Sequence, residues 1–337
     1  MNDFENKITF DDDDFLDDED INYQSYSSEI KGRKKPPIST ILLAVLFVIV
    51  VVLVIIVVKN SIGDSDDNSD NDSATTTTTQ SQTTLPPSFS ADKITEVTVT
   101  DDKKLVDSNN KPIKNVLKDT LALINSEHEY RYDTNQGGLE SLYGKGGPYN
   151  LSTSDLSLTR DTRLALNAWV GDFHNAVNIN ENVLILQAFY ADPDGHNEHQ
   201  SGLCVNMKMW DGVATSQIKD KDEYKWLLNN AYKYGFIQRY PDGKSDITGV
   251  ANEPDHFRYI GVAHSTAMKQ NNINCFETYI DHLKKFTFWG EHLYVTCENG
   301  DKYEIYFSAS NTITVPTDRE YTISGNNVDG FIVTIKN

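Results

Sequence analysis

The chain has 337 residues, and its content of 38% hydrophobic residues permits a sizeable folded core. Its formal net charge of −20 and the lack of a basic patch in its C-terminal part argue against nucleic-acid binding. Three cysteines, Cys204, Cys275 and Cys297, permit at most one disulfide, which excludes a disulfide scaffold.

Residues 1–37 are predicted to form a disordered acidic tail in the cytoplasm, ending in a short basic flank. Within residues 1–30, eleven acidic side chains face a single base, Lys7. A segment of this composition repels itself and buries no core. A solvated tail is the simpler interpretation, and docking to a basic cytoplasmic partner is the alternative.

Residues 38–58 predict a single transmembrane helix. Apart from Ser39 and Thr40, every residue in this segment is Ala, Leu, Ile, Val or Phe. At about 1.5 Å per residue, such a helix crosses a hydrocarbon core of roughly 30 Å. Four basic residues within 31–35 precede the segment, whereas only Lys59 directly follows it. The positive-inside rule therefore predicts a cell-membrane protein with a cytoplasmic N-terminus and an extracellular C-terminal domain.

The part after the predicted helix divides into three regions. Residues 59–92 are rich in Asp, Asn, Ser, Thr and Gln, a composition typical of a stalk. We assign residues 93–286 to the main domain and residues 287–337 to a small β appendage.

Hydrophobic spacing predicts an α+β domain with helices and strands in mixed order. The expected helices cover residues 114–130, 159–177, 221–234 and 276–285. The expected strands cover residues 182–190, 236–240 and 256–261, and the first of these is expected to be buried on both faces because its apolar run is continuous. Asn299 and Gly300 lie between two β-patterned runs, which predicts a hairpin in the appendage. At least one further strand is expected within residues 322–337.

Histidines and carboxylates gather in two segments, residues 192–199 and 253–256. A mononuclear catalytic zinc site needs about three N or O ligands, an open position for water and a carboxylate that acts as a base. The two segments together supply these groups. Histidines in loops are also commonly solvated or packed, so spacing alone leaves both interpretations open.

Four segments together resemble a known family. Residues 198–206, with the sequence Glu-His-Gln-Ser-Gly-Leu-Cys-Val-Asn, resemble the first signature of the zinc D-alanyl-D-alanine carboxypeptidases of the vancomycin-resistance type, which are LAS-type metallopeptidases. Residues 234–241, 246–249 and 253–261 resemble the second signature and its lead-in. The similarity spans about residues 115–285. It implies helices packed on one antiparallel sheet, with zinc at the concave face of that sheet.

The resemblance also implies roles for individual residues. His199 and His256 would bind zinc, Asn206 would occupy the third ligand position, and Glu253 would be the catalytic base. Zinc would polarise the scissile carbonyl and lower the pKa of its bound water to about 7. The implied partner is a peptidoglycan stem peptide that ends in D-Ala-D-Ala.

Three positions near the predicted ligands depart from the family pattern. Asn206 replaces an aspartate, which should weaken metal binding because an amide oxygen is neutral. Asp255 replaces a tryptophan and is expected to face solvent. Cys204 replaces a small residue; we expect it to pack on the opposite side, and zinc ligation is the alternative. Asp192, Asp194 and Glu198, around His196, are expected to form a solvated loop; the alternative is that they and His196 rebuild a different site.

A fourth departure concerns substrate recognition. The family's Ser-Gly-Tyr-Arg stretch corresponds here to residues 187–190, so the arginine expected to hold the substrate carboxylate is missing. The candidates for substrate binding or support of the site are Ser201, Arg258, Tyr190 and Gln187, with Arg258 expected mainly to support the core. Two functions follow from the pattern. One is a membrane-anchored zinc carboxypeptidase, and the alternative is a catalytically silent relative that binds cell-wall peptide or a protein partner.

Overall fold

The computed structural model describes residues 85–114, 116–132 and 138–337, all within one compact unit that spans residues 80–337. The predicted acidic tail, the predicted membrane segment 38–58 and most of the predicted stalk lie outside these residues. Within the part of the chain that is described, no helix combines the length and the hydropathy that a membrane span requires.

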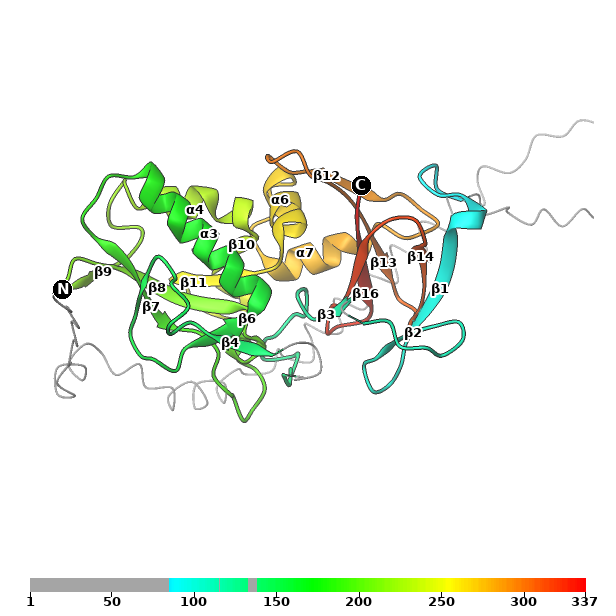
Figure 1. Ribbon diagram of the computed structural model, residues 1–337, viewed down its shortest axis with the longest axis horizontal. Coiled ribbons are helices and arrows are strands. Elements are labelled where there is room, and N and C mark those ends of the chain that lie inside the picture. Colours follow the sequence, from blue (N-terminus) through cyan, green and yellow to red (C-terminus); the bar gives the residue numbers. More distant parts are fainter. Residues whose placement is uncertain (1–84, 115, 133–137) are drawn as a thin grey trace, which may run out of the picture. The chain divides into compact units, whose positions relative to one another are not determined.

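The central sheet contains six strands and provides the framework for the predicted site (Figure 1). Its strand order is β10-β11-β8-β7-β5, and β9 pairs with β8. All neighbours are antiparallel except β5 and β7, which are parallel. The strands are β5 (Asn150–Leu151), β7 (Asn182–Gln187), β8 (Cys204–Trp210), β9 (Thr215–Ser216), β10 (Phe236–Tyr240) and β11 (Glu253–Tyr259). The expected single antiparallel sheet is therefore a mixed one, accompanied by further sheets.

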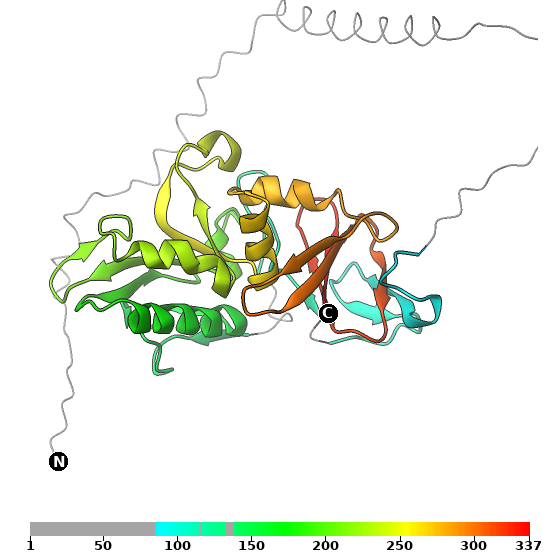
Figure 2. The same ribbon diagram turned by 90° about the horizontal axis from the view of Figure 1, so that it is seen from above.

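Two helices cover one face of this sheet, α3 (Arg160–Ala176) and α4 (Lys225–Asn230). Figure 2 shows α3 running along one side of the sheet. The core between α3 and the sheet is formed by large apolar side chains: Leu166, Trp169, Val170, Phe173, Val205, Met207, Met209 and Phe257. Successive strand residues point to opposite faces, so Asn206 and His256 lie on the face that α3 leaves open.

A second group of strands combines residues from the start of the described chain with residues from its C-terminal part. One sheet has the order β12-β13-β16-β15-β3, and another has the order β14-β1-β2. The strands are β1 (Ile94–Val99), β2 (Leu105–Asp107), β3 (Leu117–Lys118), β12 (Leu293–Thr296), β13 (Lys302–Ser308), β14 (Thr312–Pro316), β15 (Tyr321–Gly325) and β16 (Phe331–Lys336). Residues assigned from sequence to the domain 93–286 thus contribute β1, β2 and β3 to sheets completed by residues 287–337.

Two helices, α6 (Val262–Gln270) and α7 (Phe276–Leu283), pack between the two groups of strands. Their apolar side chains share one core with β12, β13 and β16. His264 of α6 links α7 to β16 through two hydrogen bonds. Its Nδ1 lies 2.8 Å from Tyr279 Oη, and its Nε2 lies 2.8 Å from Thr334 Oγ1. The remaining elements are short: β4 (Leu139–Ser141), β6 (Ser157–Thr159), α5 (Ser245–Thr248) and the 3₁₀ helices η2 (Ala91–Lys93), η4 (Glu198–Ser201) and η5 (Ala231–Tyr234).

Two expectations about secondary structure are wrong. The described residues of the segment 114–130 form no helix; Leu117–Lys118 instead pair in parallel with β15, and Leu121 and Ile124 are buried in separate cores. Tertiary pairing overrides the local helical spacing here. The strand expected to be buried on both faces, β7, alternates between buried and half-buried residues, because only one of its faces meets α3. The expected hairpin is confirmed as β12 and β13.

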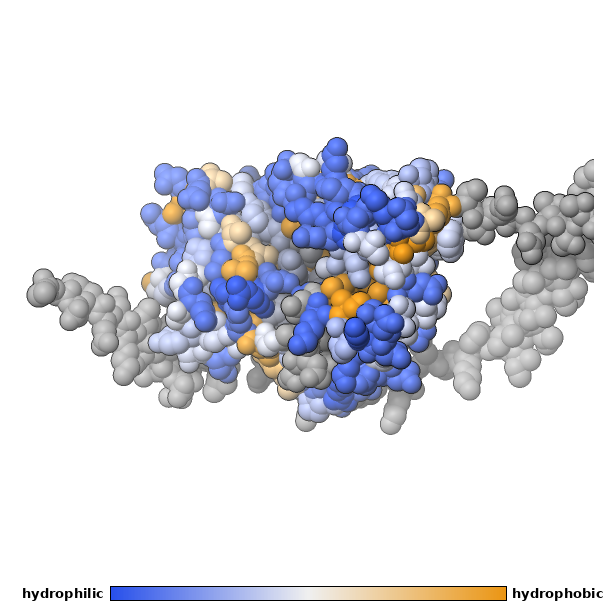
Figure 3. All heavy atoms as spheres, turned by 45° about the vertical axis from the view of Figure 1, so that its right-hand side comes forward, coloured by the Kyte–Doolittle hydropathy of each residue, from blue (hydrophilic) through white to orange (hydrophobic). Residues whose placement is uncertain are grey.

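The surface on the face drawn in Figure 3 is mostly hydrophilic. Hydrophobic residues there form separate small patches. Scattered apolar side chains of this kind are ordinary for a soluble surface and indicate no docking face.

Candidate metal centre

The first signature folds into η4 and the start of β8, and this turn fixes the position of His199. Asn197 caps η4, with its Oδ1 accepting a hydrogen bond from the His199 backbone N–H at 3.0 Å. Gly202 ends the turn at φ 67°, in the left-handed region that favours glycine. A Cβ at Gly202 would lie 2.5 Å from Cδ2 of Leu139, so the end of that side chain would have to move aside. The glycine thus holds His199 over the open face of β8.

Three of the predicted site residues meet on that face. Asn206 of β8 is directly opposite His256 of β11 in the strand register. Nε2 of His199 lies 3.1 Å from Oδ1 of Asn206, and the imidazole centroids of His199 and His256 are 4.9 Å apart. Both imidazoles are buried. Residues separated by 57 positions are therefore brought into contact with one another.

This spacing fits a tetrahedral zinc ion. With Zn–N and Zn–O bonds of about 2.0–2.2 Å, neighbouring ligand atoms lie about 3.3 Å apart and the centroids of two bound imidazoles about 5 Å apart. Burial lowers the pKa of His199 to about 3, and the nearby charge of His256 acts in the same direction. The His199 imidazole is consequently neutral at physiological pH, which is the form that binds metals.

Glu253 lies beside these residues without being an obvious ligand. Its Oε2 is 3.5 Å from Nδ1 of His256, and its side chain is about half exposed. Burial raises the pKa of the Glu253 carboxyl above its ordinary value, although the charge of His256 opposes this. The register between β10 and β11 shifts between Gln238 and Tyr240, and Tyr240 pairs with Glu253. A carboxylate with a raised pKa next to open space suits a general base.

Glu198 is buried, which contradicts the expected solvated loop. Only 1% of its surface is exposed. Its Oε1 accepts hydrogen bonds from Nε of Arg239 at 2.8 Å and from Nη1 of Arg258 at 3.2 Å. Arg239 also forms two hydrogen bonds with Glu277, at 2.6 and 3.0 Å. Burial alone would raise the pKa of Glu198, but the two guanidinium charges and His256 hold it well below its ordinary value.

Cys204 lies on the same side as Asn206, so the expectation that it packs on the opposite side is wrong. Its Sγ is 3.6 Å from Oε2 of Glu198, and the thiol is fully buried. Glu198, Cys204 and His256 bring ligand-type atoms within 4.8 Å of one another. Burial, together with the nearby charge of Glu198, holds the pKa of the Cys204 thiol well above its ordinary value.

The remaining predicted residues lie around this centre. Gln187 pairs with Asn206 across an irregularity between β7 and β8, and the Tyr190 ring stacks on His199 at a centroid distance of 5.0 Å. The Ser201 hydroxyl donates to the Glu198 carbonyl at 2.6 Å and so belongs to the turn. Arg258 supports the core as expected, donating from Nη2 to the carbonyls of Thr120 and Ala122.

Two other expectations concern acidic residues. Asp255 is buried on the α3 side of β11, where its Oδ1 lies 3.5 Å from the Ile218 N–H, so it neither faces solvent nor reaches His256 Nδ1. Asp192 binds the backbone N–H groups of Asp194, His196 and Asn197 and thereby shapes its own loop.

The sequence reasoning missed Arg239, which is fully buried. A useful signal was available. Two arginines, Arg239 and Arg258, lie next to aromatic residues in predicted strands, and a buried guanidinium requires an acidic partner.

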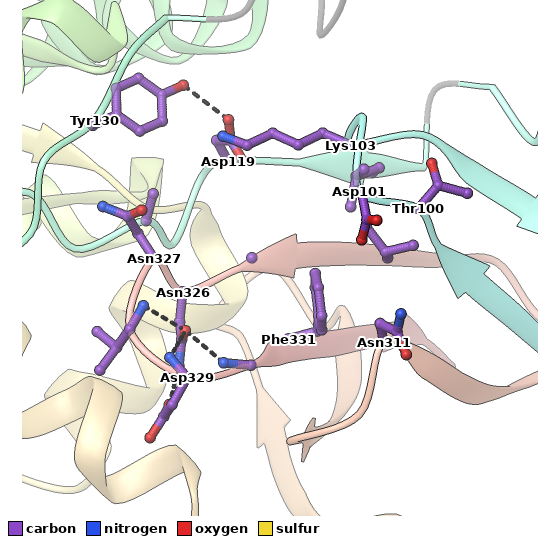
Figure 4. A pocket seen from close by; sticks show the side chains of 16 residues that line it. Thr100, Asp101, Lys103, Asp119, Tyr130, Asn311, Asn326, Asn327, Asp329 and Phe331 are labelled. Atoms are coloured by element: carbon purple, nitrogen blue, oxygen red, sulfur yellow. Dashed lines mark hydrogen bonds between the residues drawn. The ribbon is translucent and has the colours of Figure 1, made fainter.

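A pocket of about 440 Å³ lies away from these residues, and none of the predicted site residues lines it. Figure 4 shows the Tyr130 hydroxyl directed at Asp119, to which it donates at 2.9 Å. In the same view Oδ1 of Asn326 accepts hydrogen bonds from the backbone N–H groups of residues 328–330. The polar groups of this pocket therefore mainly hold its own walls together.

Comparison with known proteins places these features in context. Residues 172–262 match the family model VanY, D-alanyl-D-alanine carboxypeptidase. A D-alanyl-D-alanine carboxypeptidase of Enterococcus faecium is 35% identical over 240 residues, covering 65% of this chain and 76% of that protein. The bifunctional D-Ala-D-Ala dipeptidase and D-Ala-D-Ala carboxypeptidase VanXYC of Enterococcus gallinarum is 32% identical over 110 residues, covering 32% of this chain and 57% of that protein.

A solved structure is also similar. It is the vancomycin-resistance D,D-dipeptidase VanXYg in complex with a D-Ala-D-Ala phosphinate analogue. The two chains share 25% identity with a TM-score of 0.55, over 65% of this chain and 94% of that one. The similarity of fold thus extends over almost the whole of that enzyme.

Proposed function

This chain belongs to the D-alanyl-D-alanine carboxypeptidase family, and from that premise we propose that it is a membrane-anchored zinc metallopeptidase that acts outside the cell on peptidoglycan stem peptides. The reaction would hydrolyse the terminal D-Ala-D-Ala bond and release D-alanine. A carboxypeptidase-like activity fits both the family and the open face of the central sheet.

One observation carries the proposal. The imidazoles of His199 and His256 and the amide oxygen of Asn206 converge on the open face of β8 and β11. The carboxylate of Glu253 lies 3.5 Å from His256. Three donors beside one free carboxylate are the parts that a mononuclear hydrolytic zinc site requires. His199, Asn206 and His256 would hold the ion.

In the proposed mechanism the protein residues hold the reacting groups in place and transfer a proton. Zinc bound at this site would supply a Lewis acid for the scissile carbonyl and an acidified water. Glu253 accepts the proton of the attacking water on a carboxylate oxygen and then donates it to the leaving D-alanine amine. Tyr190, stacked on His199, lies where it would contact the bound peptide.

The anchoring and the location rest on the sequence. Residues 38–58 are long and apolar enough to span a bilayer, and the basic residues 31–35 favour a cytoplasmic N-terminus. Stem peptides of the cell wall lie on the opposite side of the membrane, where the C-terminal domain would then act.

A second candidate is a silent family member that binds cell-wall peptide or a protein partner without turnover. Two observations favour it. Asn206 provides a neutral ligand where the family pattern has an aspartate, and residues 187–190 lack the arginine expected to hold the substrate carboxylate.

The two candidates differ in zinc content and turnover. We would purify the full chain in detergent, measure bound zinc by elemental analysis, and assay D-alanine release from a stem pentapeptide. The variant Glu253→Ala should retain zinc and lose about 10²–10⁴-fold in turnover, the typical contribution of a general base. Glu320→Ala, an exposed acid in the C-terminal part, is the matched control. Protein without zinc and without turnover would contradict the enzyme and favour the silent member.

A further inference from the structure

Glu198 is the most enclosed carboxylate near the candidate metal centre, and its two oxygens have different neighbours. Oε1 is occupied by Arg239 and Arg258, whose side chains, like that of Glu198, are fully inaccessible to solvent. Oε2 faces inward to Nε2 of His256 at 3.7 Å and Sγ of Cys204 at 3.6 Å. The arginines thus hold the carboxylate in one orientation and leave Oε2 for the imidazole.

The imidazole of His256 has a ring nitrogen that could donate a hydrogen bond to Oε2 of Glu198. Its Nε2 is buried and has no hydrogen-bond partner among the described residues. The nearest acidic atom recorded for Nε2 is Oε2 of Glu198. The other nitrogen, Nδ1, lies 3.5 Å from Oε2 of Glu253. The two ring nitrogens therefore point into different surroundings.

We propose that Glu198 is a positioning residue that accepts the Nε2–H of His256 on Oε2, so that Nδ1 carries the lone pair presented to zinc. This inference rests on the proposed zinc-dependent function. Metal-binding histidines usually donate their second ring N–H to a carboxylate, which fixes both the tautomer and the orientation of the ring. A contraction of a few tenths of an ångström would bring the present 3.7 Å separation to hydrogen-bond length.

The same atoms allow a competing arrangement, in which Glu198, Cys204 and His256 themselves bind the metal. Charge argues against it. A divalent cation there would lie beside the guanidinium groups of both Arg239 and Arg258, which are buried and already bonded to Glu198. The structure therefore assigns Glu198 and Cys204 to the support of the site.

The test measures zinc affinity of the full chain by competition with a chelator, for wild type, Glu198→Asp and Glu198→Gln. Both variants should weaken zinc binding by about 10–100-fold, the usual effect of losing an outer partner of a metal ligand. Glu198→Asp keeps the charge beside both arginines but shortens the reach to His256. It therefore separates loss of orientation from loss of folding, should Glu198→Gln fold poorly.

The matched control is Glu304→Gln, because Glu304 is another fully buried acid bonded to a histidine and an arginine. It should leave the zinc affinity of the folded protein unchanged. Cobalt substitution adds a second readout, since a thiolate-to-cobalt absorption band would appear only if Cys204 were a ligand. Unchanged affinity in Glu198→Asp, or that band in the wild type, would overturn this inference while leaving zinc binding intact. A wild type that binds no zinc would overturn the proposed function and this inference together.

Discussion

Two fully buried glutamates, one in η4 beside the central sheet and one in β13, have similar neighbours. Glu198 lies between arginines and His256, whereas Glu304 lies between His292 and Arg319. In the C-terminal group both histidine nitrogens are bonded, Nδ1 to Glu304 at 2.6 Å and Nε2 to the Phe288 carbonyl at 3.0 Å.

The central group differs at both nitrogens of its histidine. Nε2 of His256 lies 3.7 Å from Oε2 of Glu198 without a hydrogen bond, and Nδ1 faces Glu253 instead of a backbone carbonyl. A glutamate, a histidine and an arginine therefore do not by themselves make a functional site. The distinguishing feature is a histidine whose second nitrogen remains available on an open face.

The largest expected contrast comes from removing each histidine. His256→Ala should lower zinc affinity and turnover by more than about 100-fold, beyond the effect of losing an outer partner, because a ligand itself is lost. His292→Ala should leave zinc per folded molecule unchanged and lower the free energy of unfolding by roughly 2 kcal/mol, since Glu304 loses a buried partner. Chelator competition and urea unfolding measure the two effects. An equal loss of zinc in both variants would contradict the comparison.

Replacing Arg239, which binds Glu198, should lower the free energy of unfolding more than replacing Arg319, which binds Glu304. Arg239→Met leaves Glu198 and Glu277 short of a fully buried cation, which should cost about 3–5 kcal/mol of unfolding free energy. The Arg319 side chain is 20% exposed, so water can partly replace it, and Arg319→Met should cost about 1–2 kcal/mol. Denaturant unfolding of both variants, with wild type measured in parallel, gives the difference. A larger cost at Arg319 would refute it.

Acid should weaken the C-terminal group in a defined range of pH. Burial raises the pKa of Glu304, but hydrogen bonds from His292, Ser88 and Arg319 lower it from 4.5 to about 2. Because the folded pKa is the lower one, the stabilisation is complete above pH 4.5 and disappears as the pH falls towards 2. This amounts to about 3 kcal/mol, at 1.36 kcal/mol per unit.

Glu304→Gln removes this titration. The difference in unfolding free energy between wild type and Glu304→Gln should therefore be greatest at neutral pH and shrink below pH 4.5. Urea unfolding at several pH values checks this. A difference that stays constant down to pH 2 would show that the carboxylate of Glu304 is not the stabilising form.

The smallest expected effect is a gain in zinc affinity. Asn206→Asp should raise zinc affinity by about tenfold, or roughly 1.4 kcal/mol, because an anionic oxygen replaces a neutral one next to His199. Asn326→Asp, at a buried amide in the C-terminal part, is a control that should leave zinc affinity unchanged. No change in Asn206→Asp would mean that position 206 is not a ligand.

The elements around the site were largely predictable from the sequence. The helix at residues 159–177 and the strand at 236–240 follow from apolar spacing, and they are confirmed as α3 and β10. The convergence of His199, Asn206 and His256 was expected from the family motifs. Local pattern sufficed for these two elements, whereas bringing the three site residues together required the resemblance to the family.

The remaining features depend on contacts that are distant in sequence. The described residues of the segment 114–130 form no helix because β3 pairs with β15, about 200 positions further along the chain. Glu198 appeared to belong to a solvated acidic loop, and its burial depends on Arg239 and Arg258 from two other strands. Cys204 is an exception: it lies two positions before Asn206 in β8, and residues two apart in a strand share a face, so its side followed from alternation and was missed.

The pairing of β1 with β14 has a consequence for biosynthesis. Thr98 and Thr312 face each other in these strands although 214 positions separate them. On the ribosome, β1 emerges long before its partner exists, so its edge stays open while the central sheet is being made. Such long-range pairing folds slowly and exposes edges to aggregation. We therefore expect the sheet that contains β1 and β14 to close after the central sheet.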